Sequence, residues 1–148
     1  MTTARRLVSA VIMCVVGAAV IGVLAPNAFG GTSAPATLAT VTVKMIGDAK
    51  GYRFEPAEIT VHAGDAIEFQ NVAGGPHDVT FWPDSIPAGA ARQLQANMPN
   101  TTGPLASPLF VTDGETYTIS TAKLKPGTYK FYCMPHLATG MHGVLVVQ

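Results

Sequence analysis

The sequence predicts an all-β protein, a β-sandwich of seven or eight short strands behind an N-terminal export signal helix. Two observations predict the sandwich. Short runs of alternating apolar and polar residues recur from residue 41 onward, and turns that contain Gly or Pro separate them. The chain has no internal repeat and no heptads, and only residues 88–95 are compatible with a short helix. We therefore expect one folded domain in this chain of 148 residues.

The expected strands alternate as half-buried strands do. Ile59 and Val61 share one face of the third strand, and Ile67 and Phe69 share one face of the fourth. The strands are expected at 41–45, 52–54, 58–62, 66–71, 77–82, 115–120, 128–133 and 143–148. Turns with Gly or Pro are expected between them at 47–51, 63–65, 74–76 and 125–127. Residues 83–112 are too long for a tight hairpin and form a long connection or a functional excursion.

The first 30 residues have the pattern of an export signal. Arg5 and Arg6 form a positive start, an almost wholly apolar run follows at 7–24, and small residues near Ala28 and Gly30 suit cleavage. The apolar run is at the short end for a membrane span. We therefore expect cleavage, with an uncleaved membrane anchor as the alternative. Either outcome places the protein in the periplasm, outside the cell, or on the outer side of the cytoplasmic membrane.

The chain then divides into three parts by composition. Residues 1–30 are the signal peptide or anchor, residues 31–40 form a flexible linker rich in small residues and Thr, and residues 41–148 form the domain. Removing Arg5 and Arg6 leaves 9 − 2 = 7 Lys and Arg against 9 Asp and Glu, a formal net charge of −2. Nucleic-acid-binding domains carry basic patches, so this balance excludes a nucleic-acid partner.

Cysteine usage singles out Cys133. Cys14 lies in the leader, so Cys133 is the one cysteine of the mature chain and has no internal partner for a disulfide. It is either a buried, inert thiol or a metal thiolate. The second interpretation is favoured because His136 and Met141 follow it on one short loop. We expect a fourth ligand, His77, to arrive from a strand of the opposite sheet.

Two His, one Cys and a weak axial Met are the ligand set of a blue-copper electron-transfer site. Thiolate and thioether suit Cu(I), whereas imidazole serves both copper oxidation states. Zinc fits less well, because Met contributes little to a tetrahedral zinc site. The four histidines, which are His62, His77, His136 and His142, include no His-x-His pair and cannot supply a trinuclear copper cluster as well. A binuclear copper centre would need a second Cys in the loop.

The chain resembles the plastocyanins, within the wider cupredoxin family. The resemblance rests on the spacing Cys133-x2-His136-x4-Met141 and on segments 59–65, 86–89, 114–117 and 127–133. It covers residues 41–148, which makes this the plastocyanin-like copper-binding domain, and it implies an eight-stranded Greek-key sandwich with one copper ion at one end. The implied ligands are His77, Cys133, His136 and Met141. It also implies that His136, beside Leu137, is the electron port, with Tyr132 on a second electron path.

Three features depart from the plastocyanin pattern. Asp78 follows the first His ligand, where plastocyanins usually have Asn. Met134 follows the Cys, where a small polar residue is common. The acidic patches of plant plastocyanins have no clear counterpart among Asp84, Asp113 and Glu115. These changes bear on the reduction potential and the docking partner, but not on the expectation of copper.

The sequence thus predicts a type 1 copper protein that carries single electrons between redox partners outside the cytoplasm. Partner proteins are expected to dock near His136, and the protein is expected to act as a monomer. No base, nucleophile pair or open metal position indicates an enzyme or a small-molecule substrate. The alternative is a copper-binding module for storage, delivery or sensing, which would exchange the metal instead of electrons. His62 is expected to be a solvated strand residue, and His142 a surface or outer-sphere residue.

Overall fold

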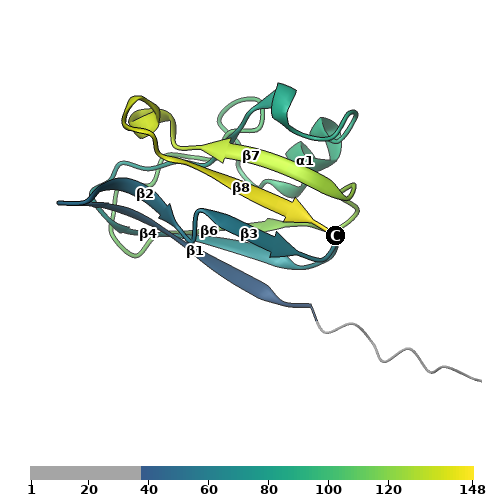
Figure 1. The fold of residues 1–148 in the computed structure, drawn as a ribbon, viewed down its shortest axis with the longest axis horizontal. Coiled ribbons are helices and arrows are strands. Elements are labelled where there is room, and N and C mark those ends of the chain that lie inside the picture. The colour runs from purple at the N-terminus through teal and green to yellow at the C-terminus, as the bar shows by residue number, and fades with distance from the viewer. Residues whose placement is uncertain (1–37) are drawn as a thin grey trace, which may run out of the picture. The chain divides into compact units, whose positions relative to one another are not determined.

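The computed structural model describes residues 38–148. The predicted leader and most of the predicted linker, at 1–37, lie outside the described residues. Eight strands form two four-stranded sheets that pack face to face (Figure 1). The first sheet has the order β2 (Gly51–Glu55), β1 (Thr40–Asp48), β4 (Ala66–Ala73) and β6 (Thr116–Ser120). The second has the order β3 (Glu58–Val61), β8 (His142–Val147), β7 (Gly127–Tyr132) and β5 (Thr80–Phe81).

The all-β sandwich predicted from the sequence is confirmed. Strands β1 and β4 are parallel, as are β3 and β8, whereas the other neighbours in each sheet are antiparallel. This mixed pairing means that the chain passes repeatedly between the two sheets instead of completing one before the other. As a result, the connections at one end of the sandwich bring distant parts of the sequence together.

The core lies between the sheets and is rich in aromatic rings. Phe54 and Phe69 of the first sheet meet Phe131 of the second edge to face, with ring centroids 4.8 and 5.4 Å from it. Such pairs add about 0.5–1.5 kcal/mol each beyond the burial of their area. The side chains predicted to face inward in the third and fourth strands are buried as expected. Met45 and Met98 are also buried packing residues.

The fifth strand is shorter than predicted. The sequence pattern favoured a strand over 77–82, but only Thr80–Phe81 pairs with β7 as a strand. His77 instead exchanges backbone hydrogen bonds with Phe110, at 3.0 and 2.8 Å. The Val79 N–H donates to the Ser107 hydroxyl at 2.9 Å. The segment before β5 is therefore held by residues from the long connection and not by a ladder, which alternation alone does not reveal.

The long connection at residues 83–112 contains two short helices and then returns to the segment that contains His77. The 3-10 helix η1 (Pro83–Ser85) is followed by α1 (Ala91–Asn97), close to the helix expected at 88–95. The Asn97 amide anchors α1 by donating to the carbonyls of Ser120 and Ala122 at 2.9 and 2.8 Å. Across residues 38–148, the structure has no helix whose length and apolar character suit a bilayer crossing.

Candidate metal centre

Cys133 directly follows β7, and its side chain is fully buried. The chain then forms the 3-10 helix η2 (Met134–Thr139) and turns back at Gly140, whose φ of 87° is a left-handed conformation that favours glycine. In Figure 1 this loop lies at the end of the sandwich away from the C-terminus. We call residues 133–141 the Cys133 loop. Because β7 is paired on both sides, the position of the sulfur is set by the sheet.

Backbone hydrogen bonds close the Cys133 loop on itself. The His136 N–H donates to the Cys133 carbonyl at 3.1 Å, and the Met141 N–H donates to the His136 carbonyl at 3.2 Å. The Cys133 N–H in turn donates to the Met141 carbonyl at 3.1 Å. These three bonds link the three predicted ligands of the loop in a ring. Met141 is fully buried, so its side chain lies inside the protein at this end of the sandwich.

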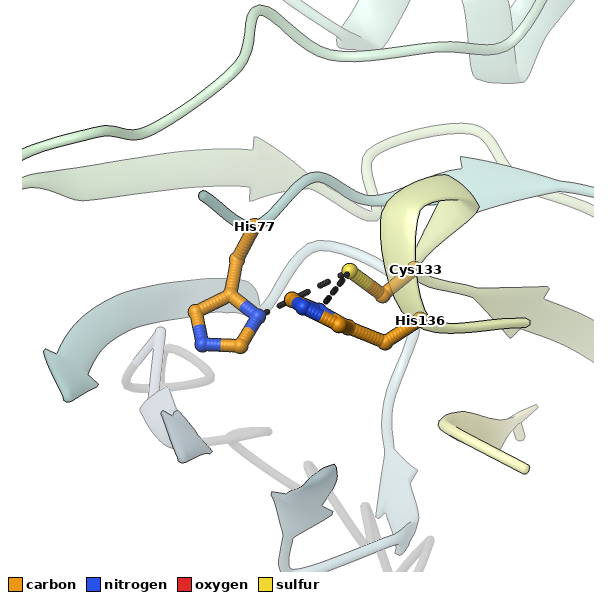
Figure 2. Close-up of side chains that lie close together, drawn as sticks. All are labelled: His77, Cys133 and His136. Carbon is orange, nitrogen blue, oxygen red and sulfur yellow. Dashed lines mark hydrogen bonds between the residues drawn. The ribbon is translucent and has the colours of Figure 1, made fainter. Parts of the chain in front are cut away.

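His77 and His136 both turn toward the sulfur of Cys133 (Figure 2). The His77 Nδ1 lies 3.6 Å from the Cys133 Sγ, and the His136 Nδ1 lies 3.4 Å from it. One ligand atom from each of the three residues lies within 4.8 Å of the others. The sequence prediction placed His77 on a strand of the opposite sheet. It lies instead in the segment that crosses from β4 in one sheet to β5 in the other.

Hydrogen bonding and burial set the environment of the three donor groups. The His77 Nε2–H donates to the Ala73 carbonyl at 3.0 Å, which leaves the Nδ1 lone pair facing the sulfur. Burial, followed by the neighbouring His77, holds the pKa of His136 below its usual value. Burial is also the main cause that raises the pKa of the Cys133 thiol to about 11. A bound metal ion would replace that proton, because a coordinating thiol is deprotonated.

The donor set fits copper. The group offers two imidazole nitrogens and one sulfur. Cu(I) and Cu(II) both accept these ligands. The buried Met141 adds a thioether on the same loop, which no hard cation would prefer. His62 and His142 are both exposed and lie outside the three-residue group. Both side chains are exposed as predicted, but His62 lies one residue beyond the end of β3 and not in the strand.

Asp78 connects the His77 segment to the Cys133 loop. Its Oδ1 accepts a hydrogen bond from the Met134 N–H, and its Oδ2 accepts one from the Thr80 hydroxyl at 2.8 Å. The side chain is almost completely buried. The sequence drew attention to Asp78 and missed Thr80, although residues two positions apart share a face in an extended segment.

The sequence also missed Tyr52. Its ring stacks on the His136 imidazole, with ring centroids 3.6 Å apart and planes inclined by 10°. Alternation offered a signal, because Tyr52 lies two residues from the buried Phe54 and so shares its strand face, although the end of the sheet leaves Tyr52 partly exposed. Tyr132, which the plastocyanin resemblance put on a second electron path, is 8% exposed and packs against Trp82.

This protein is a β-sandwich of two sheets, and at one end of it two His side chains and one Cys side chain lie close together. That is the architecture of a cupredoxin. Comparison with known proteins specifies the family. The sequence model of one family, the copper binding proteins of the plastocyanin/azurin type, matches residues 41–148. The chain belongs to that family.

The matching relatives include plastocyanins. The plastocyanin of Prochlorothrix hollandica is 36% identical over 117 residues, which cover 79% of each chain. Plastocyanin A/B of Petroselinum crispum is 38% identical over 107 residues, which cover 72% of this chain and 98% of the relative. Among solved structures, oxidised plastocyanin from Dryopteris crassirhizoma has a TM-score of 0.53 and 36% identity, covering 73% of this chain and all of that one.

Proposed function

We propose that this protein is a type 1 copper electron carrier with His77, Cys133, His136 and Met141 as its ligands. The observation that carries the proposal is the position of the Cys133 Sγ, 3.6 and 3.4 Å from the Nδ1 atoms of His77 and His136. Bound copper supplies a one-electron couple between Cu(I) and Cu(II). The same four side chains serve both states, so little rearrangement accompanies the transfer.

The protein's own contribution is a rigid, shielded set of donors. His77 is fixed by the Ala73 carbonyl and by its backbone bonds to Phe110, and the ring of bonds within the Cys133 loop fixes the other donors. His77, Cys133 and Met141 are buried, whereas His136 is partly exposed. His136 is therefore the donor through which an electron reaches the surface. The high burial also opposes rapid metal exchange, which favours a carrier over a delivery module.

A redox partner protein would dock on the apolar surface around His136. Met134 and Leu137, on either side of it in the Cys133 loop, are 56% and 38% exposed, and Tyr52 beside it is 37% exposed. A surface of this kind suits a transient contact whose specificity does not depend on a dense charge patch. The comparisons with plastocyanins support a carrier without catalytic activity.

The domain plan and the location belong to the same proposal. Residues 1–30 would direct export and then be removed or serve as a tether, residues 31–40 would act as a linker, and residues 41–148 would form the carrier domain, working as a monomer outside the cytoplasm. Expression of the full chain, followed by N-terminal sequencing of the exported and membrane fractions, tests this part. A cytoplasmic, uncleaved product would contradict it.

Visible absorption after addition of Cu(II) to the domain tests the copper site itself. The domain should develop an intense blue thiolate band, which Cys133→Ala should abolish. His142→Ala changes an exposed histidine next to Met141 and is the matched control that should retain the band. A colourless wild-type protein, or a band that survives Cys133→Ala, would refute the proposal. If the band forms but a Cu(I) chelator strips the metal within seconds, the storage or delivery alternative becomes the better one.

A further inference from the structure

Met134 differs from the other methionines of the described chain in its exposure. Residues 38–148 contain four methionines, and three of them, Met45, Met98 and Met141, are at most 4% exposed. The Met134 side chain is 56% exposed. Oxidation of a methionine thioether depends on access, and it turns a flexible apolar side chain into a polar sulfoxide. Met134 is therefore the thioether of residues 38–148 that an oxidant in solution can reach.

The backbone at Met134 is fixed, although its side chain faces solvent. Met134 begins η2 directly after Cys133, whose side chain is fully buried, and Pro135 follows it. The Met134 N–H donates to the Asp78 Oδ1, and this bond uses only the backbone of Met134. An oxygen atom can therefore be added to the Met134 sulfur without breaking the hydrogen bond that holds the start of the Cys133 loop.

The Met134 thioether lies on the apolar surface around His136 that is proposed above for docking. It shares this surface with Leu137 and Tyr52, which are 38% and 37% exposed. A partner that closes on the surface removes water from it. A sulfoxide oxygen there would lose its hydrogen bonds to water, and an acceptor left without a partner opposes the contact. Oxidation of this one side chain would thus weaken docking beside His136 and leave the donor atoms of the metal centre unchanged.

We propose that Met134 is a modification site for hydroperoxides, and that its oxidation weakens docking at His136 without altering the metal centre. The Met134 sulfur attacks one oxygen of hydrogen peroxide, so that an S–O bond forms and the O–O bond breaks. The sulfur loses two electrons and the peroxide gains them. The proton of the transferred oxygen leaves with the released hydroxide as water. Methionine sulfoxide is reduced back by dedicated reductases, so the change is reversible. The effect on docking rests on the copper function proposed above, whereas the site of oxidation does not.

Dilute hydrogen peroxide, added to the copper-loaded protein in its Cu(II) state and then removed with catalase, tests the inference. Peptide mass spectrometry should find one added oxygen atom on Met134 before any on Met45, Met98 or Met141. The self-exchange rate between reduced and oxidised protein, measured by NMR line broadening, should fall about tenfold relative to the untreated sample, as expected for a polar group left without a partner. The blue band should keep its position and intensity. Treatment with a methionine sulfoxide reductase should restore the rate.

Two variants separate an effect on docking from oxidative damage elsewhere in the protein. Met134→Leu has no thioether at this position, so peroxide should leave its self-exchange rate equal to that of its own untreated sample. Met134→Gln places a permanent polar group on the surface and should exchange electrons slowly without any peroxide.

The inference would be overturned, with the copper function left standing, by a Met134 that resists peroxide while a buried methionine is oxidised. An oxidised Met134 with an unchanged exchange rate, an equal loss of rate in treated Met134→Leu, or a Met134→Gln protein as fast as the wild type would overturn it too. So would loss of the blue band on treatment, because the oxidant would then act at the metal centre. A wild type that never develops the band would instead refute the copper function, and the mass spectrum would still identify the oxidised methionine.

Discussion

Gly47 lies directly opposite Tyr52 in the β1–β2 ladder, and the Tyr52 ring occupies the space that a side chain at position 47 would need. A Cβ at Gly47 would come within 2.5 Å of the Tyr52 Cε1 and 2.7 Å of its Cδ1. The ring therefore bends over the glycine and reaches His136 in the Cys133 loop. The β1–β2 hairpin is far from the Cys133 loop in sequence, but through Tyr52 it supports His136, the one predicted ligand that is partly exposed.

Removing the Tyr52 ring should loosen His136. Tyr52→Leu loses the stacked pair and should lower the free energy of unfolding of the metal-free domain by about 0.5–1.5 kcal/mol more than Tyr52→Phe, which keeps the stack. Urea unfolding of the three proteins measures the difference. The His136 imidazole NMR signals should broaden in Tyr52→Leu only. Equal stability of Tyr52→Leu and Tyr52→Phe would show that the stack contributes nothing.

Gly47→Ala should displace the ring without deleting it. The added methyl group meets the Tyr52 ring, so we expect a loss of about 1–3 kcal/mol, which is typical of an overpacked site. The loss should be smaller in a Tyr52→Ala background, because the clash partner is absent there. A double-mutant cycle from urea unfolding measures this coupling. Additive effects of the two substitutions would contradict the steric relationship. Gly114→Ala does not serve as a control for Gly47→Ala, because Gly114 has a φ of 90°, which disfavours any side chain.

Acid should destabilise the domain through Asp65. This carboxylate accepts hydrogen bonds from the backbone N–H groups of Ala39 and His62, at 2.9 and 2.8 Å, and these bonds hold its pKa below the usual value. A lowered pKa in the folded state stabilises the fold at pH values above the ordinary pKa of about 4. That contribution is lost as the pH falls through the lowered pKa.

The measurement is the melting temperature of wild type and Asp65→Asn over a pH series from about 6 to 2. We expect the wild type to be the more stable protein at pH 6. The two curves should converge as the pH falls, because protonation of Asp65 removes the stabilisation by its carboxylate from the wild type. The substitution has already removed that stabilisation from the variant. Parallel curves would mean that Asp65 does not contribute to the acid dependence.

A charge on the apolar surface should slow electron exchange without altering the site. Leu137→Glu places a carboxylate next to His136, and two copies that meet through this surface would then repel each other. We expect the self-exchange rate between reduced and oxidised protein to fall at low salt, while the visible spectrum stays the same. NMR line broadening in mixtures of the two states measures this rate.

Thr60→Glu makes the same charge change on the exposed side of β3, where Thr60 pairs with Val146 near the C-terminal end. This control should exchange electrons as fast as the wild type. If both variants slow the exchange equally, net charge and not docking at His136 would account for the effect. An unchanged rate in Leu137→Glu would move the docking surface elsewhere.

Local patterns in the sequence determined most of the sandwich. Alternation placed Ile59, Val61, Ile67 and Phe69 on buried faces, because the side chains of a strand point to its two sides in turn. The same reasoning failed at 77–82, where hydrogen bonds from Ser107 and Phe110 replace a ladder. Those partners come from a long connection whose path no local pattern specifies.

The candidate site divides in the same way. The sequence by itself determined that one cysteine, a histidine and a methionine share a short loop, because their spacing is a local property of the chain. Only the tertiary structure decided by which segment His77, predicted as a ligand, reaches Cys133 across 56 residues, and that Tyr52 stacks on His136. The physical reason is that these contacts depend on how the sheets pair and pack, and short-range propensity carries no information about contacts between distant segments.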